Sequence, residues 1–264
     1  MKQLFFLALV LLLFSSCSQY QKALKSEDVA TKYNMAEKLY DQQKYTKALR
    51  LFEQIAPSYR GKPQAEKMFY MYAKSFYAIE EYYSSGYQFE SFASSYPKSE
   101  KLEEASYLGA ISYSKLSPVY SLDQVDTYKA IDKLQTFINI YPNSQYLTET
   151  NVIVKELREK LEKKSFEIAK QYNTISDYKS ALIALDIFIA DFPGTPFKEE
   201  ALFYKLDSSY KLAVNSINSK MQERLIVAKT AYTNLIKFNA NTTFKGQADA
   251  MLVSIENDLK QFSK

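Results

Sequence analysis

The chain has 264 residues, with 34 Lys and Arg, 30 Asp and Glu and no His. A net charge of +4 is too small to indicate nucleic-acid binding, and the lack of His excludes His-dependent triads and His-ligated metal sites. There are 5 Gly and 7 Pro, few for many short strands and turns, but 23 Tyr and 17 Phe. These values predict an all-α protein with aromatic packing.

The N-terminus begins with one positive charge at Lys2, followed by the apolar run LFFLALVLLLF over residues 4–14. This is the layout of a secretory signal, and the run is too short to span a bilayer, which takes roughly 20 residues. Two serines lead into Cys17, the single cysteine. The segment resembles the lipobox of bacterial lipoproteins, in which the signal is cleaved before the cysteine and the thiol is acylated. Phe14 departs from the usual Leu, and an ordinary secretory signal with an incidental Cys is the alternative.

The lipobox reading predicts a cleaved signal peptide over residues 1–16 and a lipidated tether over 17–31. Stable anchoring takes two or more acyl chains, since each buried CH₂ contributes about 0.8 kcal/mol. Ser18 stands where many inner-membrane lipoproteins have Asp, and no acidic export-like run follows. We therefore expect a lipid-anchored protein on the periplasmic face of the outer membrane.

Three proline strings, SYPKS, IYPNS and DFPGT, give the phase of an internal repeat. Twelve residues before each Pro lies a small residue, with large apolar residues 4, 7 and 11 places after it. Such spacing forms one helical stripe, and the Pro ends the helix. The copies begin at Ser85, Ala130 and Ala181, and weaker ones without the Pro read Ala48, Phe52, Ile55, Tyr59 and Ala231, Leu235, Phe238.

Each of these helices is expected to follow a partner helix with its own small residue, such as Ala36, Ala73 or Ala169. The pattern resembles the tetratricopeptide repeat, whose period is 34 residues, and predicts a solenoid of about five tetratricopeptide-like helix pairs. Successive copies lie more than 34 residues apart. The excess indicates an insertion between Lys115 and Ala130 and lengthened helices in the fifth pair. A long helix should join the third pair to the fourth. Residues 32–146 would hold repeats 1–3, and residues 147–264 the linking helix and repeats 4–5.

Catalysis has little support in the sequence. Cys17 is committed to lipid, and the five scattered Gly match no phosphate-binding loop. Paired acids such as Glu80-Glu81 point about 100° apart on a helix, as on a solvated face. We therefore expect no enzyme activity, no cofactor and no metal, and a protein that binds.

The predicted first helices of the first two pairs carry a candidate peptide-binding groove. Tyrosine rings can cover apolar side chains of an extended peptide, and lysines can pair with its acidic groups or terminal carboxylate. The alternative is that these residues are lateral packing or ordinary amphipathic surface. The candidate residues are Tyr33, Tyr40, Lys67, Tyr70, Lys74 and Tyr77.

The whole pattern resembles the BamD family of outer-membrane assembly lipoproteins, in a Bacteroidetes-like form rich in Tyr, Lys and Asn. The resemblance is carried by residues 52–100, by SLDQVDTYKAIDKLQTFINIYPNSQY over 121–146 and by the long Lys/Glu helix after it. It implies a scaffold of the β-barrel assembly machine. Repeats 1–3 would bind the C-terminal strands of unfolded outer-membrane proteins, and repeats 4–5 the POTRA domains of a BamA-type barrel subunit.

Two rival interpretations remain at the level of sequence. One is a tetratricopeptide lipoprotein of Tol-type or cell-wall maintenance. The other is a SusD-like glycan-binding lipoprotein, although such proteins are about twice as long and display Trp, which this chain lacks.

Overall fold

The computed structural model describes residues 19–262. The predicted signal peptide and Cys17 lie outside the described residues. The described part of the chain divides into two compact units. Unit 1 holds residues 19–118 and Asp123–Val154, and unit 2 holds Val119–Leu122 and residues 155–262.

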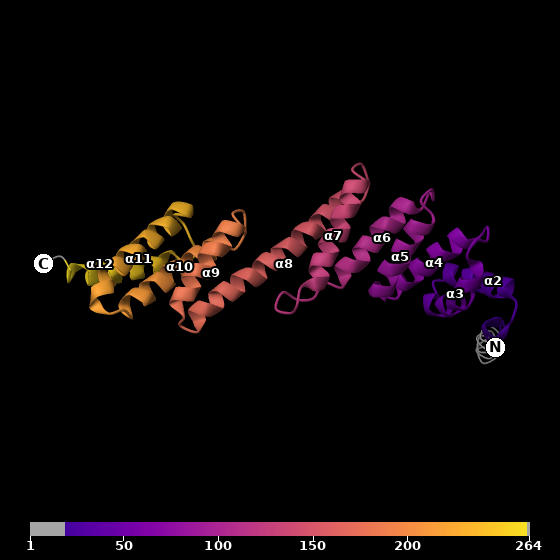
Figure 1. Cartoon of the computed structure of the whole chain (residues 1–264), viewed down its shortest axis with the longest axis horizontal. Coiled ribbons are helices and arrows are strands. Elements are labelled where there is room, and N and C mark those ends of the chain that lie inside the picture. The colour runs from indigo at the N-terminus through magenta and orange to yellow at the C-terminus, as the bar shows by residue number, and fades with distance from the viewer. Residues whose placement is uncertain (1–18, 263–264) are drawn as a thin grey trace, which may run out of the picture. The chain divides into compact units, whose positions relative to one another are not determined.

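Unit 1 is built from successive antiparallel helix pairs (Figure 1). A helical segment over residues 19–25 precedes them and buries Tyr20 and Ala23 against the first pair. The long helix α8 begins in this unit and continues into unit 2. The pairs are α2 (Val29–Asp41) with α3 (Tyr45–Tyr59), α4 (Ala65–Ala78) with α5 (Tyr82–Ser95), and α6 (Leu102–Lys115) with α7 (Val125–Ile140).

Unit 2 continues the same plan with the rest of α8 (Leu147–Thr174) and four further helices (Figure 1). The helices that follow are α9 (Tyr178–Asp191), α10 (Lys198–Val214), α11 (Asn218–Phe238) and α12 (Lys245–Lys260). The predicted all-α class and pairwise arrangement are confirmed, and the residues described contain no strand. The predicted joining helix is α8, with 28 residues, and the fifth pair is lengthened, with 17 residues in α10 and 21 in α11.

The small residues that set the repeat phase lie at the contacts between helices. Ala48, Ser85, Ala130 and Ala181 are fully buried, and Phe89 and Phe92 are buried beside them. Burying each such ring contributes about 1.5–3 kcal/mol. A Cβ at Gly109 of α6 would lie 3.1 Å from the Cβ of Phe89. The close approach of α5 and α6 therefore requires a residue without a side chain at this position.

Each proline string ends a helix as predicted, because α5, α7 and α9 stop two residues before Pro97, Pro142 and Pro193. A second feature recurs in the turns between paired helices. Gln43, Glu80 and Ser176 have φ values of 58°, 63° and 65° in the first, second and fourth pairs. A left-handed residue directly after a helix reverses the chain tightly, so these three pairs need little connecting sequence.

Some predicted packing residues lie elsewhere. Phe238, assigned to the stripe of the fifth pair, is 49 % exposed, and Lys198 lies over its ring at 5.5 Å. Ile168 and Tyr172, the large residues that the repeat pattern places beside Ala169 in the packed face of α8, are 51 % and 36 % exposed. The helix buries its neighbouring face, through Phe166, against α9 and α10. No helix among residues 19–262 has both the length and the apolar character to cross a bilayer.

Candidate functional site

The six predicted groove residues lie on neighbouring helices of unit 1. Two are on α2 and four on α4, and α4 contacts both α2 and α6. These are the first helices of their pairs, so the fold aligns one face of each. The residues are Tyr33, Tyr40, Lys67, Tyr70, Lys74 and Tyr77.

All four tyrosines among the six have rings that contact other rings. Tyr40 packs edge to face against Tyr45, and Tyr70, which is 8 % exposed, packs edge to face against Phe89 and Phe92. Tyr33 is 8 % exposed and stacks on Tyr59 with ring centroids 5.1 Å apart. Tyr77 packs edge to face against Tyr82 at 5.8 Å. Burial is the main cause that raises the pKa of both the Tyr33 and the Tyr77 hydroxyl. Tyr33 and Tyr77 stabilise the helix pairs, and neither they nor Lys74 line the pocket that Tyr40, Lys67 and Tyr70 share.

A pocket of about 460 Å³ opens between α2, α4 and the start of α6. Its apolar wall comes from Met71 and Phe92, which are 3 % and 1 % exposed. Three of the six predicted residues line it, and so does the turn before α6. The lining residues are Tyr40, Asp41, Pro63, Glu66, Lys67, Tyr70, Met71, Phe92 and Lys101.

The pKa values of two polar residues on the pocket wall are raised. Lys67 forms an ion pair with Glu37 of α2, and that hydrogen bond raises the pKa of the Lys67 ammonium. Burial, reinforced by the neighbouring Tyr45, raises the pKa of the Tyr40 hydroxyl to about 12. Tyr40 therefore stays a neutral hydrogen-bonding hydroxyl at physiological pH.

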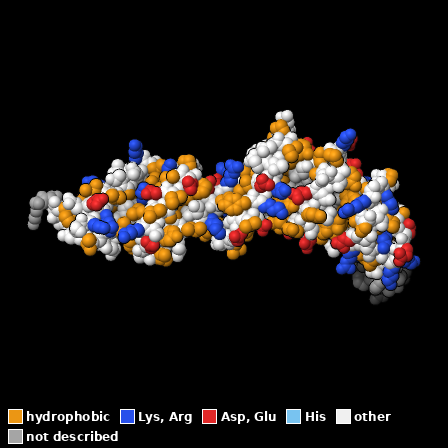
Figure 2. Space-filling view, viewed as in Figure 1, with side chains coloured by type: hydrophobic (Ala, Val, Ile, Leu, Met, Phe, Trp, Pro, Cys, Tyr) orange, Lys and Arg blue, Asp and Glu red, His pale blue; other side chains and the backbone are white. Residues whose placement is uncertain are grey.

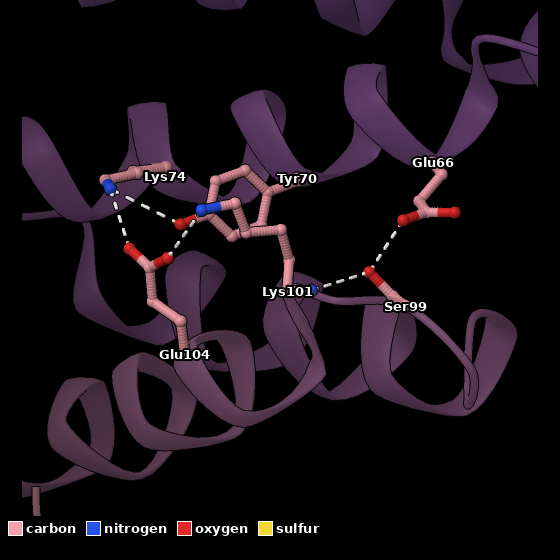
Figure 3. Close-up of polar contacts among 6 residues, drawn as sticks. All are labelled: Glu66, Tyr70, Lys74, Ser99, Lys101 and Glu104. Atoms are coloured by element: carbon pink, nitrogen blue, oxygen red, sulfur yellow. Dashed lines mark hydrogen bonds and ion pairs between the residues drawn. The ribbon is translucent and has the colours of Figure 1, made fainter. Parts of the chain in front are cut away.

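A charged network lies beside the pocket and joins α4 to α6 (Figure 3). Glu104 of α6 accepts from Lys74 Nζ at 2.9 Å and from Lys101 Nζ at 3.1 Å. Lys74 also donates to the Tyr70 hydroxyl at 3.3 Å, and that hydroxyl hydrogen-bonds to Glu104. The network holds two lysines around one carboxylate, so it carries one net positive charge.

The titration of Glu104 reflects opposing causes. Burial alone would raise its pKa, but the hydrogen bonds from Tyr70, Lys74 and Lys101 outweigh burial and lower the pKa to about 2. The same contact, after burial, raises the pKa of Tyr70. Glu104 is therefore ionised and Tyr70 neutral across the physiological range.

An aromatic stack recurs where one helix pair meets the next. The residues directly before α8, α10 and α12 are aromatic. Each of them stacks on a ring two helices earlier, on α6, α8 and α10 respectively. Tyr146 lies 4.1 Å from Tyr107, Phe197 5.8 Å from Phe166, and Phe244 4.3 Å from Phe203, measured between ring centroids. The interplanar angles, 8°, 7° and 13°, are those of parallel rings.

The junction between α4 and α6 has a lysine where these three have a ring, and the junction between α2 and α4 has Gln64 there. Lys101 directly precedes α6, and its Nζ lies 5.5 Å from the centroid of the Tyr70 ring. The side chain of Lys101 is 55 % exposed, so a flexible charged chain occupies the place of a fixed ring. The 460 Å³ pocket, lined by both Tyr70 and Lys101, lies at this junction.

Comparison with known protein families shows to which family the chain belongs. The model of the YfiO family, described as outer membrane lipoprotein, matches residues 25–225. The chain belongs to the YfiO outer membrane lipoprotein family. No curated protein sequence matches this chain.

The YfiO match includes both units, from before α2 into α11. It confirms the resemblance to the BamD-type tetratricopeptide family that residues 52–100 and 121–146 carry. The pocket and the Glu104 network both lie inside the matched range. The C-terminal part of α11 and all of α12 lie beyond it.

Sequence reasoning missed several site residues of this YfiO family member. Lys101 and Glu104 were not predicted, nor was the apolar wall of Met71 and Phe92. A signal for Lys101 exists, because aligning the repeats places it with Tyr146, Phe197 and Phe244. The same alignment places Glu104 with Glu149 and Glu200, and Lys170 donates to Glu200 from 30 residues earlier just as Lys74 donates to Glu104.

The arrangement suits binding. Within residues 19–262, His, Cys, Asp and Glu side chains form no cluster of three that could hold a metal ion. The pocket combines an apolar wall, neutral hydroxyls and the ammonium groups of Lys67 and Lys101, which are paired with Glu37 and Glu104. Such a surface can hold an aromatic side chain and an adjacent anionic group.

Proposed function

We propose that this protein is a periplasmic scaffold lipoprotein of the β-barrel assembly machine, anchored by acylated Cys17 to the outer membrane. In this role the pocket of unit 1 binds the C-terminal strand of an unfolded outer-membrane protein, and the fourth and fifth helix pairs bind the POTRA domains of a BamA-type barrel subunit. The observation that carries the proposal is the missing ring at the junction of α4 and α6.

The missing ring suggests how a peptide side chain would bind. At the three junctions that follow, from α6 to α12, a ring from the chain itself lies parallel to the ring of the preceding helix. Beside Tyr70 the equivalent place holds the exposed Lys101 side chain instead of a ring, next to a pocket bounded by Met71 and Phe92. An aromatic side chain from a bound strand would stack there on Tyr70, a contact that contributes about 0.5–1.5 kcal/mol beyond its buried area.

Lys101 supplies the partner for the terminal carboxylate. Its ammonium group is exposed at the pocket, next to the place of the proposed peptide ring. A strand that ends in an aromatic residue carries its ring and its carboxylate on the same residue. Ring stacking on Tyr70 and an ion pair with Lys101 can therefore form together.

The test uses a fluorescent peptide that ends in Phe with a free carboxylate. We expect Lys101→Tyr to fill the pocket with a ring, as Tyr146 does beside Tyr107, and to weaken peptide binding by about tenfold or more, the effect of losing one hydrogen-bonded ion pair. Fluorescence anisotropy measures the affinity. Because the substitution copies a native arrangement, the folded state should be retained, and circular dichroism checks this.

Two controls accompany this measurement. Lys98→Tyr places the same ring on an exposed residue of the same turn, outside the pocket, and should bind as the parent does. A peptide with an amidated C-terminus should bind the parent weakly. Unchanged binding by a folded Lys101→Tyr variant would refute the pocket assignment.

The scaffold role is tested separately from the peptide. Mild detergent extraction followed by capture of this protein should recover the barrel subunit. If Tol-type or cell-wall components were recovered in its place, the assembly role would be wrong even if the pocket bound peptides.

A further inference from the structure

A second pocket in unit 1 is lined by lysines and lies apart from the peptide site. It has a volume of about 220 Å³ and is formed by the segment before α2, the end of α2 and the start of α3. Three of its lining residues are lysines, and no carboxylate lines it within the described part of the chain. The lining residues are Gln19, Tyr20, Met35, Lys38, Leu39, Gln42, Lys44 and Lys47.

No negatively charged side chain of this pocket pairs with these lysines. Lys44 donates to the neutral amide of Gln42 at 2.9 Å. Lys47 lies over the ring of Tyr20, 5.5 Å from its centroid. Figure 2 shows Lys and Arg side chains at this end of unit 1, with Asp and Glu side chains between them. The pocket therefore has the charge to receive an anion.

The chain connects this pocket closely to the predicted lipid. Gln19 lines the pocket and is two residues after Cys17, so extended backbone separates their Cα atoms by about 7 Å at most. Tyr20 and Ala23 are 6 % and 1 % exposed in the core of the first pair, which fixes this segment to α2 and α3. An acyl chain on Cys17 would therefore bring the membrane surface to the pocket.

We propose that this pocket binds the phosphate group of an anionic lipid headgroup in the membrane that holds the anchor. The proposal rests on the lipid anchoring of the proposed function. Lys38, Lys44 and Lys47 surround the phosphate, and the bound headgroup sets how the first helix pair meets the membrane. A basic patch beside an acyl anchor is a recognised way of strengthening attachment.

The test measures how strongly the pocket binds lipid vesicles in a protein that carries no acyl chains. The mature chain carrying Cys17→Ser is mixed with vesicles of phosphatidylethanolamine and phosphatidylglycerol, and flotation gives the bound fraction. Near an anionic surface each lysine contributes about fivefold in affinity, so changing Lys38, Lys44 and Lys47 to Gln should weaken binding by roughly 100-fold. Vesicles in which phosphatidylcholine replaces phosphatidylglycerol should bind the parent weakly.

A matched control removes the same charge elsewhere. Lys179, Lys220 and Lys237 are exposed on unit 2, and their joint change to Gln should leave flotation nearly unchanged. An equal loss in both triple variants would overturn the proposal, because general charge attraction would then explain the binding.

A further arm distinguishes a lipid from free phosphate. Inorganic phosphate is titrated while the backbone amide signals of the pocket are followed by NMR. Saturation of the pocket by millimolar phosphate without any flotation would overturn the lipid assignment. Peptide binding at Lys101 is measured on the same variants and should not change, so failure here is separable from failure of the peptide site.

Discussion

Single residues at the junction of α4 and α6 decide both its charge and its shape. Glu104 joins the two helices by accepting from Lys74 and Lys101, and Lys101 stands where three later junctions have a ring. Removing the carboxylate would leave two ammonium groups facing each other. Glu104 therefore has a structural role that the pocket depends on.

Glu104→Gln tests that role through pH. Losing a hydrogen-bonded charge partner should lower the free energy of unfolding by about 1–3 kcal/mol at pH 7. The folded pKa of about 2 is below the ordinary 4.5, so the carboxylate stabilises the fold fully above about pH 4.5. That contribution is lost as the pH falls from 4.5 towards 2.

Thermal unfolding at pH 7, 4.5 and 3 checks this prediction. The difference in Tm between the parent and Glu104→Gln should be largest at pH 7 and shrink at pH 3. Glu100→Gln, an exposed neighbour in the turn before α6, provides the control and should leave Tm nearly unchanged throughout. A difference that is the same at pH 7 and pH 3 would contradict the assigned pKa.

The helices depend on small residues that allow close approach. Gly109 faces Phe89, which is fully buried, and a Cβ at 3.1 Å would meet an atom fixed directly to the α5 backbone. Replacing a helical Gly with Ala gains about 1 kcal/mol in helix preference, but overpacking a core costs about 1–3 kcal/mol. The steric cost should exceed the gain here because the Phe89 Cβ cannot rotate away.

Gly109→Ala is therefore expected to destabilise the protein by about 1 kcal/mol. Gly246→Ala is the matched control, since a Cβ there has no atom within 4 Å and the residue lies in the first turn of α12. It should be neutral or stabilising by up to about 1 kcal/mol. Urea unfolding measures both, and a stabilising Gly109→Ala would show that α5 and α6 can move apart without cost.

At the scale of the whole molecule, the proposed lipid anchor would decide where the protein binds its partners. The YfiO family consists of outer membrane lipoproteins, and Cys17 is the chain's single thiol. Acyl chains on this residue would hold the protein far more strongly than exposed lysines do.

Cys17→Ala should move the protein from the outer-membrane fraction to the soluble periplasm. Fractionation and immunoblotting measure this after a wash at high salt, which screens attraction between lysines and headgroups. Cys17→Ser should behave in the same way, because a hydroxyl does not replace the acylated thiol. Retention of both variants after the wash, in cells depleted of the barrel subunit, would contradict lipid anchoring.

The sequence by itself determined the helical class, the repeat phase and the long helix α8. It could do so because helical periodicity and proline stops are local: residues 4 and 7 apart share a face whatever the rest of the chain does. It also picked out the helix faces that carry Tyr40, Lys67 and Tyr70. It could not show that Tyr33 and Tyr77 are packed against Tyr59 and Tyr82.

Only the tertiary structure decided which residues form the site. Lys101 and Glu104 meet Tyr70 and Lys74 because α6 is packed against α4, and that packing depends on the register between helix pairs, which involves contacts about 30 residues apart. The absence of a ring beside Tyr70 is recognised by comparison with the stacked rings at three later junctions. Local patterns carry no information on such distances, whereas the packed helices set them.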